Sequence, residues 1–479
     1  MSDNTPAPLW DDALTLCRDL QRGTVGAVEL MRNVYARINA LNPQVNALVN
    51  LLDEREALAL AATADRVPVG ERGPLHGLPM APKDAVAVRG FPTTWGFKPF
   101  AERIETQDSA LAARMRKAGA IFIGHSNMPE FGLGSNTFNA VFGATLNPYD
   151  PTKTAGGSSG GAAVALATDM LPLADGSDMG GSLRNPASFC NVVGLRPSIG
   201  RTPLSRGFAW YGRLVTAGPM AKTVADTSLL FSVLAGPDPA DPLTLPEPGE
   251  HFLDALVPAI HDADNPVKVA VSEDLGLLPI DPAVRKVIQD AAAKFADLGA
   301  TVDYAHPNLE GAMDVFQTQR AAGLRTLGRN LDATVANWRD HAKDTALWNI
   351  DKGFALTADE LLSSEIKRSR IYAHIAEFFE NYDVLVLPAA QVPPFGIEQE
   401  WIDNIDGHGL ETYIDWMAVC CMITVTSLPT LSVPGGFSPD GLPIGVQLVG
   451  KPRGDLQLLK IAHWFEQSTQ FYTQRPHII

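Results

Sequence analysis

Two short segments rich in glycine and serine contain the residues of this chain best suited to covalent chemistry. The first is GGSSGG at residues 156–161, and the second is GSDMGGS at residues 176–182. A serine hydroxyl can attack a carbonyl carbon once a base removes its proton. Glycines let the backbone approach a ligand closely, and consecutive N–H groups in such a turn can converge on developing negative charge. The segments are candidates for a nucleophile and for an anion-stabilising loop.

The first segment on its own has two other interpretations. Glycine and serine are typical of flexible linkers, but the small apolar residues 162–167 follow directly and predict a buried helix. Residues 157–161 also fit the GxSxG pattern, which in α/β-hydrolases places a serine, here Ser159, on a strained strand-to-helix turn. That interpretation needs a downstream acid and a histidine, and the spacing singles out neither.

Lys83 lies in the mainly apolar stretch GLPMAPKDAVAVRG, residues 77–90. A lysine in such a strand is costly unless it has a function or its head group reaches water. Both interpretations stay open from the residues of this stretch alone.

Together, the three segments resemble the amidase signature family. The resemblance rests on Lys83-Asp84 after GLP, on GGSSGG, and on GSDMGGSLRNPA at 176–187. Flanking segments extend it over nearly the whole chain: HSNMPEFGLGSN (125–136), LNPYDP (146–151), VGLRPSIGR (193–201) and DGLPIGVQLVGKP (440–452). The resemblance argues against both the linker and the role of Ser159 as a GxSxG nucleophile.

The resemblance implies a Ser–Ser–Lys triad. Ser182 matches the nucleophile that forms an acyl-enzyme, Ser158 the bridging serine whose peptide bond is cis in the family, and Lys83 the general base. Lysine, with an ordinary pKa near 10.4, can be that base only if burial disfavours its charged form. Ser158 would pass a proton from Ser182 to Lys83 and later back to the leaving amine.

The resemblance also implies groups that support the triad. The oxyanion hole would consist of the backbone N–H groups of Met179, Gly180, Gly181 and Ser182. Three polar residues match positions that brace the triad: Ser159, Asp178 and Arg184. A surface ion pair is the alternative for Arg184. Pro82 departs from the family, which more often has an aliphatic residue there; proline lacks an N–H donor, which puts the backbone geometry at Lys83 in question.

Bulky apolar residues occur in the segments expected around the acyl group of the substrate. They are Trp95, Phe131, Leu133, Phe316, Tyr413 and Trp416. A position in the core is the alternative for each. A pocket lined by several of them would gain about 25 cal/mol per Å² of buried apolar surface, and it would compensate a charged group poorly for lost hydration. We therefore expect uncharged aryl or aliphatic amides as substrates, with some esterase activity.

Three functions are compatible with this resemblance. The first is an amidohydrolase that acts alone on a small-molecule amide. The alternatives are the glutaminase subunit of an amidotransferase complex and a catalytically silent binding protein with the same fold. Intact Lys83, Ser158 and Ser182 argue against the silent protein.

The elements that must position these residues predict an α/β fold. We expect a single large domain, residues 1–479, whose central mixed twisted sheet is covered by helices on both faces. Its parts would be a helical N-terminal segment (1–70), a catalytic core (74–235), a helical excursion on the substrate side (308–380) and a return to the sheet (384–479). We expect Asn42-Pro43 to break the helical pattern of the first part.

Composition narrows the function classes further. The net charge of −16 argues against nucleic-acid and anionic-membrane binding, which need basic patches. No His or Cys pair has metal-ligand spacing, so we expect no metal and no organic cofactor. Four cysteines without CxxC spacing and an acidic N-terminus favour a cytoplasmic protein. The expected partners are a small-molecule amide and, at most, a second copy in a homodimer.

Overall fold

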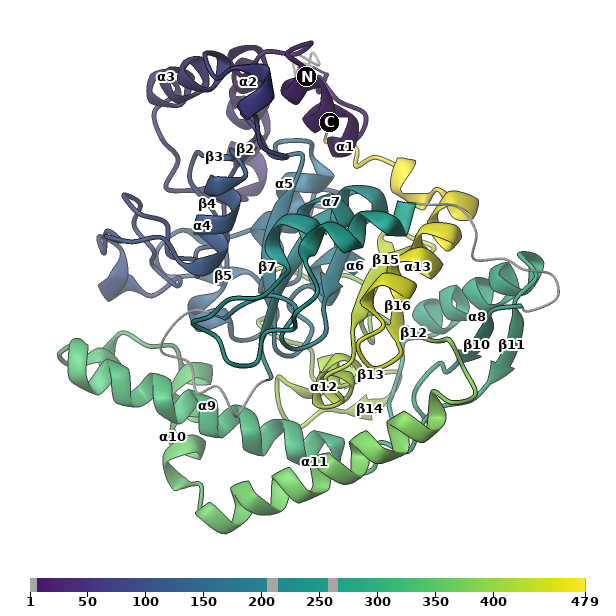
Figure 1. Cartoon of the computed structure of the whole chain (residues 1–479). Helices are drawn as coiled ribbons and strands as arrows, with labels where there is room; N and C mark the ends of the chain where they lie inside the picture. Colours follow the sequence, from purple (N-terminus) through teal and green to yellow (C-terminus); the bar gives the residue numbers. More distant parts are fainter. Residues whose placement is uncertain (1–6, 205–213, 257–265, 479) are drawn as a thin grey trace.

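An eight-stranded mixed sheet forms the centre of the molecule (Figure 1). The computed structural model describes residues 7–204, 214–256 and 266–478. The strands are β7 (Ala174–Asp178), β8 (Val193–Arg196), β9 (Thr216–Ala221), β10 (Lys268–Val271), β11 (Thr301–Tyr304), β12 (Val384–Pro388), β15 (Thr430–Phe437) and β16 (Pro443–Gly450). Their order is β11-β10-β12-β16-β15-β8-β9-β7. Only β10 pairs in parallel, with β11 and β12, and the other pairs are antiparallel.

Helices cover both faces of this sheet, as the sequence predicts. Successive side chains of a strand point to opposite faces. In β12, Val384 and Val386 pack with α8 (Pro282–Asp297) and α13 (Asp455–Thr469), whereas Leu385 and Leu387 belong to the core on the other face. Helices α5 (Gly160–Ala167), α6 (Arg184–Phe189) and α12 (Ala418–Val425) contribute to that second core. Helix α7 (Val224–Leu234) packs against β8 and β9.

The N-terminal segment is helical, but its predicted break is wrong. It contains α1 (Ala13–Arg22), α2 (Ala27–Val45) and α3 (Glu54–Asp65). Pro43 lies inside the last turn of α2, which continues to Val45. The turn closes because the N–H of Asn46 donates to the carbonyl of Asn42 at 2.8 Å. A proline this close to the end of a helix removes one hydrogen bond without stopping the turn.

Three helices form the predicted excursion between β11 and β12. They are α9 (Ala312–Thr334), α10 (Asp344–Ala355) and α11 (Ala358–Phe378), and Figure 1 shows them together along one side of the sheet. A capping box at Thr357 and Glu360 begins α11. Helix α9 contacts α12, so the excursion packs against an element of the central core.

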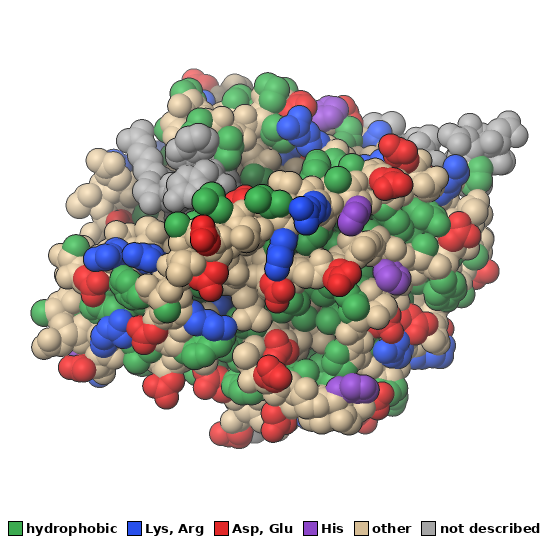
Figure 2. Space-filling view, turned by 90° about the horizontal axis from the view of Figure 1, so that it is seen from below, with side chains coloured by type: hydrophobic (Ala, Val, Ile, Leu, Met, Phe, Trp, Pro, Cys, Tyr) green, Lys and Arg blue, Asp and Glu red, His purple; other side chains and the backbone are tan. Residues whose placement is uncertain are grey.

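Short elements complete the part that holds the candidate site. They are α4 (Ala110–Lys117) and the strand pairs β1 (Leu48–Val49) with β4 (His125–Ser126), β2 (Pro79–Met80) with β3 (Ile121–Phe122), β5 (Phe138–Asn139) with β6 (Gly143–Ala144), and β13 (Asn404–Ile405) with β14 (His408–Gly409). In the described ranges, no helix has the length and apolar character needed to cross a membrane. Figure 2 shows acidic and basic side chains interspersed over one face.

Candidate active site

Lys83 lies among three serine hydroxyls, of which those of Ser158 and Ser159 are buried. It follows β2, and its own backbone forms a bridge with Ser126. The side chain is fully buried, and Nζ donates to Ser158 Oγ at 2.7 Å and to Ser159 Oγ at 3.0 Å. Ser177 Oγ lies 3.1 Å from the same nitrogen. The fold therefore gathers hydroxyls from both glycine-serine segments around one amine.

Pro82 does not disturb the backbone at Lys83. Its carbonyl accepts hydrogen bonds from Ser126 N at 3.0 Å and from His125 Nδ1 at 2.8 Å. The N–H of Lys83 donates to Asp175 Oδ1 at 3.3 Å. The missing donor of proline is of no consequence here because the neighbouring groups hold the segment from both sides.

Burial controls the charge of Lys83. Loss of hydration lowers its pKa to about 7, although the carboxylates of Asp175 and Asp178 partly oppose this change. Asp175 is itself fully buried, and burial raises its pKa to about 6 against the opposing effect of Lys83. A lysine with a pKa near neutrality is substantially uncharged at pH 7–8, which is the state that a general base requires.

The loop that carries Ser158 is held through its carbonyl groups. The Gly157–Ser158 peptide bond is cis, as the family resemblance implies. The carbonyl of Gly156 accepts from Thr137 Oγ1 at 2.8 Å, and the carbonyl of Gly157 accepts from Ser135 Oγ at 2.7 Å. These bonds fix the position of Ser158 beside Lys83.

Close packing explains the second glycine pair of this loop. A Cβ atom on Gly160 would lie 2.3 Å from Thr137 Oγ1, and one on Gly161 would lie 2.3 Å from the backbone nitrogen of Asn127. Both glycines begin α5, whose residues are all buried. The segment is a tightly enclosed helix start, and a flexible linker is ruled out.

Ser182 ends the second loop, between β7 and α6. Its carbonyl accepts from the N–H of Ser159 at 3.2 Å, which joins the two glycine-serine segments. Ser182 is 8% exposed, more than Ser158 at 2% or Lys83 at 0%. Its hydroxyl forms no hydrogen bond with the described residues, so no direct bond connects it to Ser158. Of the two candidate triad serines, the more exposed one is therefore also the one whose hydroxyl is unengaged.

The four amides expected in the oxyanion hole are not equivalent. The N–H of Gly181 donates to Asp178 Oδ1 at 3.0 Å and is occupied within the loop. The amides of Gly180 and Ser182 donate to no acceptor in the described part of the chain. Gly181 has a φ of +110°, which favours glycine. The oxyanion hole stays a prediction, in which the free amides of Gly180 and Ser182 are better placed to donate than the amide of Gly181, which shapes the loop.

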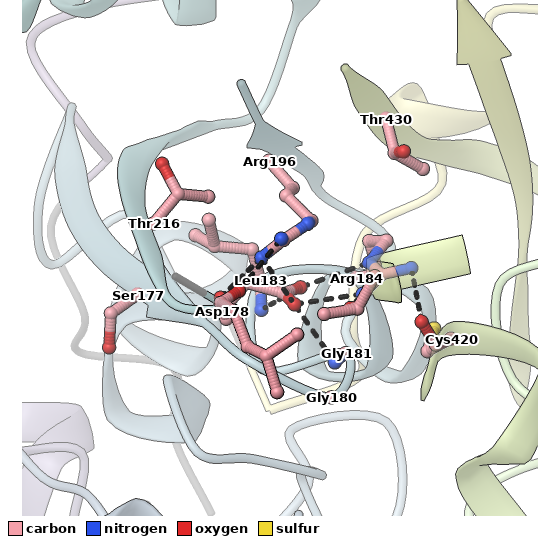
Figure 3. A network of polar contacts seen from close by, with 12 residues as sticks. Ser177, Asp178, Gly180, Gly181, Leu183, Arg184, Arg196, Thr216, Cys420 and Thr430 are labelled. Carbon is pink, nitrogen blue, oxygen red and sulfur yellow. Dashed lines mark hydrogen bonds and ion pairs between the residues drawn. The ribbon is translucent and has the colours of Figure 1, made fainter. Parts of the chain in front are cut away.

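Asp178 and Arg184 form a buried ionic network together with Arg196 (Figure 3). Asp178 Oδ1 lies 2.8 Å from Arg184 Nη2 and 3.4 Å from Arg196 Nη1. Burial alone would raise the pKa of Asp178, but the two guanidinium groups hold it well below its usual range. The surface alternative for Arg184 is thereby excluded.

The same carboxylate fixes both sides of Ser182. Asp178 Oδ1 accepts from Gly181 N at 3.0 Å, and Oδ2 accepts from Leu183 N at 3.1 Å. One charged side chain thus determines the backbone conformation before and after the serine.

Comparison with known proteins identifies the family. The family model described as Amidase matches residues 29–459. The chain belongs to the amidase family.

Its relatives match it over nearly their full length. The amidase is 32% identical to an acylamidase of Rhodococcus erythropolis, over 98% of this chain and 97% of that protein. It is also 32% identical to a glutamyl-tRNA(Gln) amidotransferase subunit of Picosynechococcus sp., over 97% of this chain and 99% of that protein.

Among solved structures, a bacterial aryl acylamidase has a TM-score of 0.88 at 26% identity, covering 97% of this chain and 98% of its own. A 6-aminohexanoate cyclic dimer hydrolase has a TM-score of 0.88 at 25% identity, covering 99% and 100%. These findings confirm the predicted family and fold, and they make the chain a hydrolase of amide C–N bonds.

Sequence reasoning missed several polar residues around the site of the amidase. Asp175 and Ser177 alternate on β7 and both contact Lys83, and Arg196 contacts Asp178. Asn185 Nδ2 donates to Ser135 Oγ at 2.8 Å. The period of two along residues 174–178 could have indicated that Asp175 and Ser177 share a face.

Phe316, in α9, lies against the serine loop. Its Cζ is 3.0 Å from the position that a Cβ on Gly180 would take. Segment 128–137 also reaches the site, because a Cβ on Gly132 would lie 3.3 Å from Ser158 Oγ. Phe131 and Leu133 pack in a hydrophobic cluster with residues of α9 and α10, and Trp95 packs against that cluster.

The two remaining candidates for the pocket have other surroundings. Trp416 is fully buried, and its ring contacts Phe189 and Phe395 in the core. Tyr413 is also buried, but its hydroxyl bonds to Arg320 and Asn349, so its surroundings are not purely apolar. An aromatic side chain in the sequence does not reveal what its polar end meets.

Metal-binding groups and disulfides do not define this site. In residues 7–204, 214–256 and 266–478, no three His, Cys, Asp or Glu side chains are placed to hold a metal ion. The cysteines are all buried as free thiols. Cys421 Sγ lies 3.1 Å from the Cβ position of Gly180, so one thiol packs on the serine loop.

Proposed function

We propose that the chain hydrolyses carboxylic amides through an acyl-enzyme on Ser182, with Lys83 and Ser158 as the proton relay. The observation that carries this proposal is the fully buried Lys83 with Nζ 2.7 Å from Ser158 Oγ. Neutral Lys83 accepts the proton of Ser158 as Ser158 takes that of Ser182. Ser182 Oγ then bonds to the amide carbon.

The later steps return these protons. Backbone N–H groups of Met179, Gly180 and Ser182 stabilise the tetrahedral oxyanion. The C–N bond breaks as Ser158 protonates the leaving amine and recovers a proton from Lys83. Water, deprotonated by the same relay, then hydrolyses the ester and restores the Ser182 hydroxyl. Asp178 and Arg184 hold the loop throughout and take no proton.

The proposed substrates are amides with an apolar acyl or aryl group beside the scissile bond. Phe316 against Gly180 and the cluster around Phe131 and Leu133 support this choice. The acylamidase and aryl acylamidase relatives support it independently. Four buried free thiols favour a reducing cytoplasm. We propose that the chain acts without a different partner protein, as a monomer or a homodimer.

The alternative is a glutaminase subunit, which similarity to glutamyl-tRNA(Gln) amidotransferase subunits favours. Comparing kcat/KM for an aromatic amide, a short aliphatic amide and glutamine separates the two functions. We expect the aromatic amide to give the highest value with the purified chain alone. Preference for glutamine, or activity that depends on a copurified second polypeptide, would favour the glutaminase subunit over the stand-alone amidase.

Replacing each serine beside Lys83 tests the relay. We expect Ser158→Ala to lower kcat by about 10²–10⁴, the contribution typical of acid–base catalysis, because the proton path is cut. Ser159→Ala removes a hydroxyl 3.0 Å from the same amine, but it leaves the path intact and should be much milder. Steady-state rates on one anilide provide the comparison. The reverse order of severity would favour Ser159 as the bridging residue.

A further inference from the structure

Arg320 is a buried guanidinium without a carboxylate partner in the described residues. It lies on α9 and is 5% exposed. Its Nη1 donates to Asn349 Oδ1 and its Nη2 to Tyr413 Oη, and both acceptors are neutral. Burying a positive charge with only neutral partners is costly, so such a group is suited to an anion that arrives with a ligand.

The hydroxyl of Tyr413 points to the same kind of ligand. Its oxygen accepts from Arg320 and also from Asn349 Nδ2 at 2.6 Å. Both lone pairs are then used, and the O–H hydrogen remains to be donated. We call Arg320, Asn349 and Tyr413 the Arg320 cluster. Apart from one lone pair of Asn349 Oδ1, its unused hydrogen-bonding capacity consists of donors, which is the complement of a carboxylate.

The cluster lies next to the wall of the candidate site. Phe316 precedes Arg320 by four residues on the same face of α9, or about 6 Å along the helix axis. Phe316 Cζ lies 3.0 Å from the Cβ position of Gly180 in the serine loop. Cys421, which packs on that same position, is close enough to Arg320 for the guanidinium to affect its thiol electrostatically. An apolar surface at Phe316 thus leads from the serine loop toward a cationic end.

We propose that the Arg320 cluster binds a carboxylate at the far end of the substrate's acyl group. The substrate class is then a monoamide of a dicarboxylic acid, whose apolar chain passes Phe316. This inference rests on the proposed acyl-enzyme mechanism and narrows its substrates. It also revises the expectation of uncharged amides: the apolar lining applies beside the scissile bond, whereas the remote end meets a positive charge.

Matched anilides test this proposal. In the wild type, kcat/KM for the monoanilides of succinic, adipic and suberic acid is compared with that for butyric, hexanoic and octanoic anilide. At the best chain length, we expect the carboxylate to raise kcat/KM about 10–100-fold, mainly through KM, as for other hydrogen bonds to charged groups. Glutaric monoamide should give a higher kcat/KM than glutamine, because the cluster offers no anionic partner for an α-ammonium group.

Substitutions separate binding from structure. In Arg320→Met, the ratio of kcat/KM for each acid to kcat/KM for its neutral counterpart should fall to unity. Arg320→Lys should restore part of this ratio. Tyr413→Phe, which keeps the ring, should lower the ratio and serves if Arg320→Met does not fold. Arg329→Met is the matched control: this exposed arginine on α9 contacts the Phe354 ring, and its loss should leave the ratio unchanged.

The outcomes distinguish this inference from the proposed function. A wild type that hydrolyses neutral anilides as well as the acids at every chain length overturns the inference alone. Equal losses on both substrates in Arg320→Met and Tyr413→Phe also overturn it, because they indicate a structural role. Failure of the wild type to hydrolyse any amide overturns the proposed function as well.

Discussion

The Ser182→Ala variant is expected to lose amide hydrolysis, with kcat lower by roughly 10⁵–10⁶, because no acyl-enzyme can form. The substitution removes one hydroxyl that forms no hydrogen bond with the described residues. The midpoint of thermal unfolding should therefore change by less than about 2 °C. Initial rates on an anilide measure the loss, and intact-protein mass spectrometry after fluorophosphonate treatment measures the covalent adduct.

Ser232→Ala is a suitable control for this experiment. Ser232 lies on α7, and its hydroxyl donates to the Leu229 carbonyl at 2.7 Å, away from the glycine-serine loops. It should keep wild-type labelling and rates. A Ser182→Ala protein that still forms the adduct would show that another serine is the nucleophile.

The second large effect concerns the pH dependence set by Lys83. In the wild type, kcat/KM should rise with pH through about 7, because burial lowers the pKa of this amine to about 7 and the neutral form prevails above it. Lys83→Met removes the titrating base. We expect kcat/KM to fall by about 10²–10⁴ near neutrality and this acid limb to disappear. A pH series with a neutral anilide is the measurement.

Asp175→Asn provides a matched test of the same limb. In the wild type, the backbone N–H of Lys83 donates to Asp175 Oδ1 at 3.3 Å, and asparagine retains an oxygen that can accept this bond. The substitution does remove a negative charge that favours the protonated form of Lys83. The pKa of Lys83 should fall further, so the limb should move to lower pH. An unchanged limb would contradict coupling between the two groups. A wild-type optimum below about pH 6 would contradict a lysine base altogether.

The coarse organisation of the fold followed from the sequence. The predicted helical excursion over 308–380 corresponds to α9, α10 and α11, and the predicted return to the sheet after 384 corresponds to β12, β15 and β16. Pro43 shows where local rules fail. The sequence indicates a helix breaker, but the position of the proline within the last turn and the pairing of Asn46 decide that α2 continues.

The residues of three segments carried the resemblance to the amidase family, and that resemblance implied the members of the proposed triad, whereas the order of predicted helices and strands indicated the fold class. Tertiary structure alone decided the electrostatics, because the pKa of Lys83 depends on burial and on Asp175, which is 92 positions away in the chain. It also decided that Gly181 shapes the loop and that Tyr413 meets Arg320. Hydration and hydrogen-bond partners are properties of the folded surroundings, which a local pattern of residues does not contain.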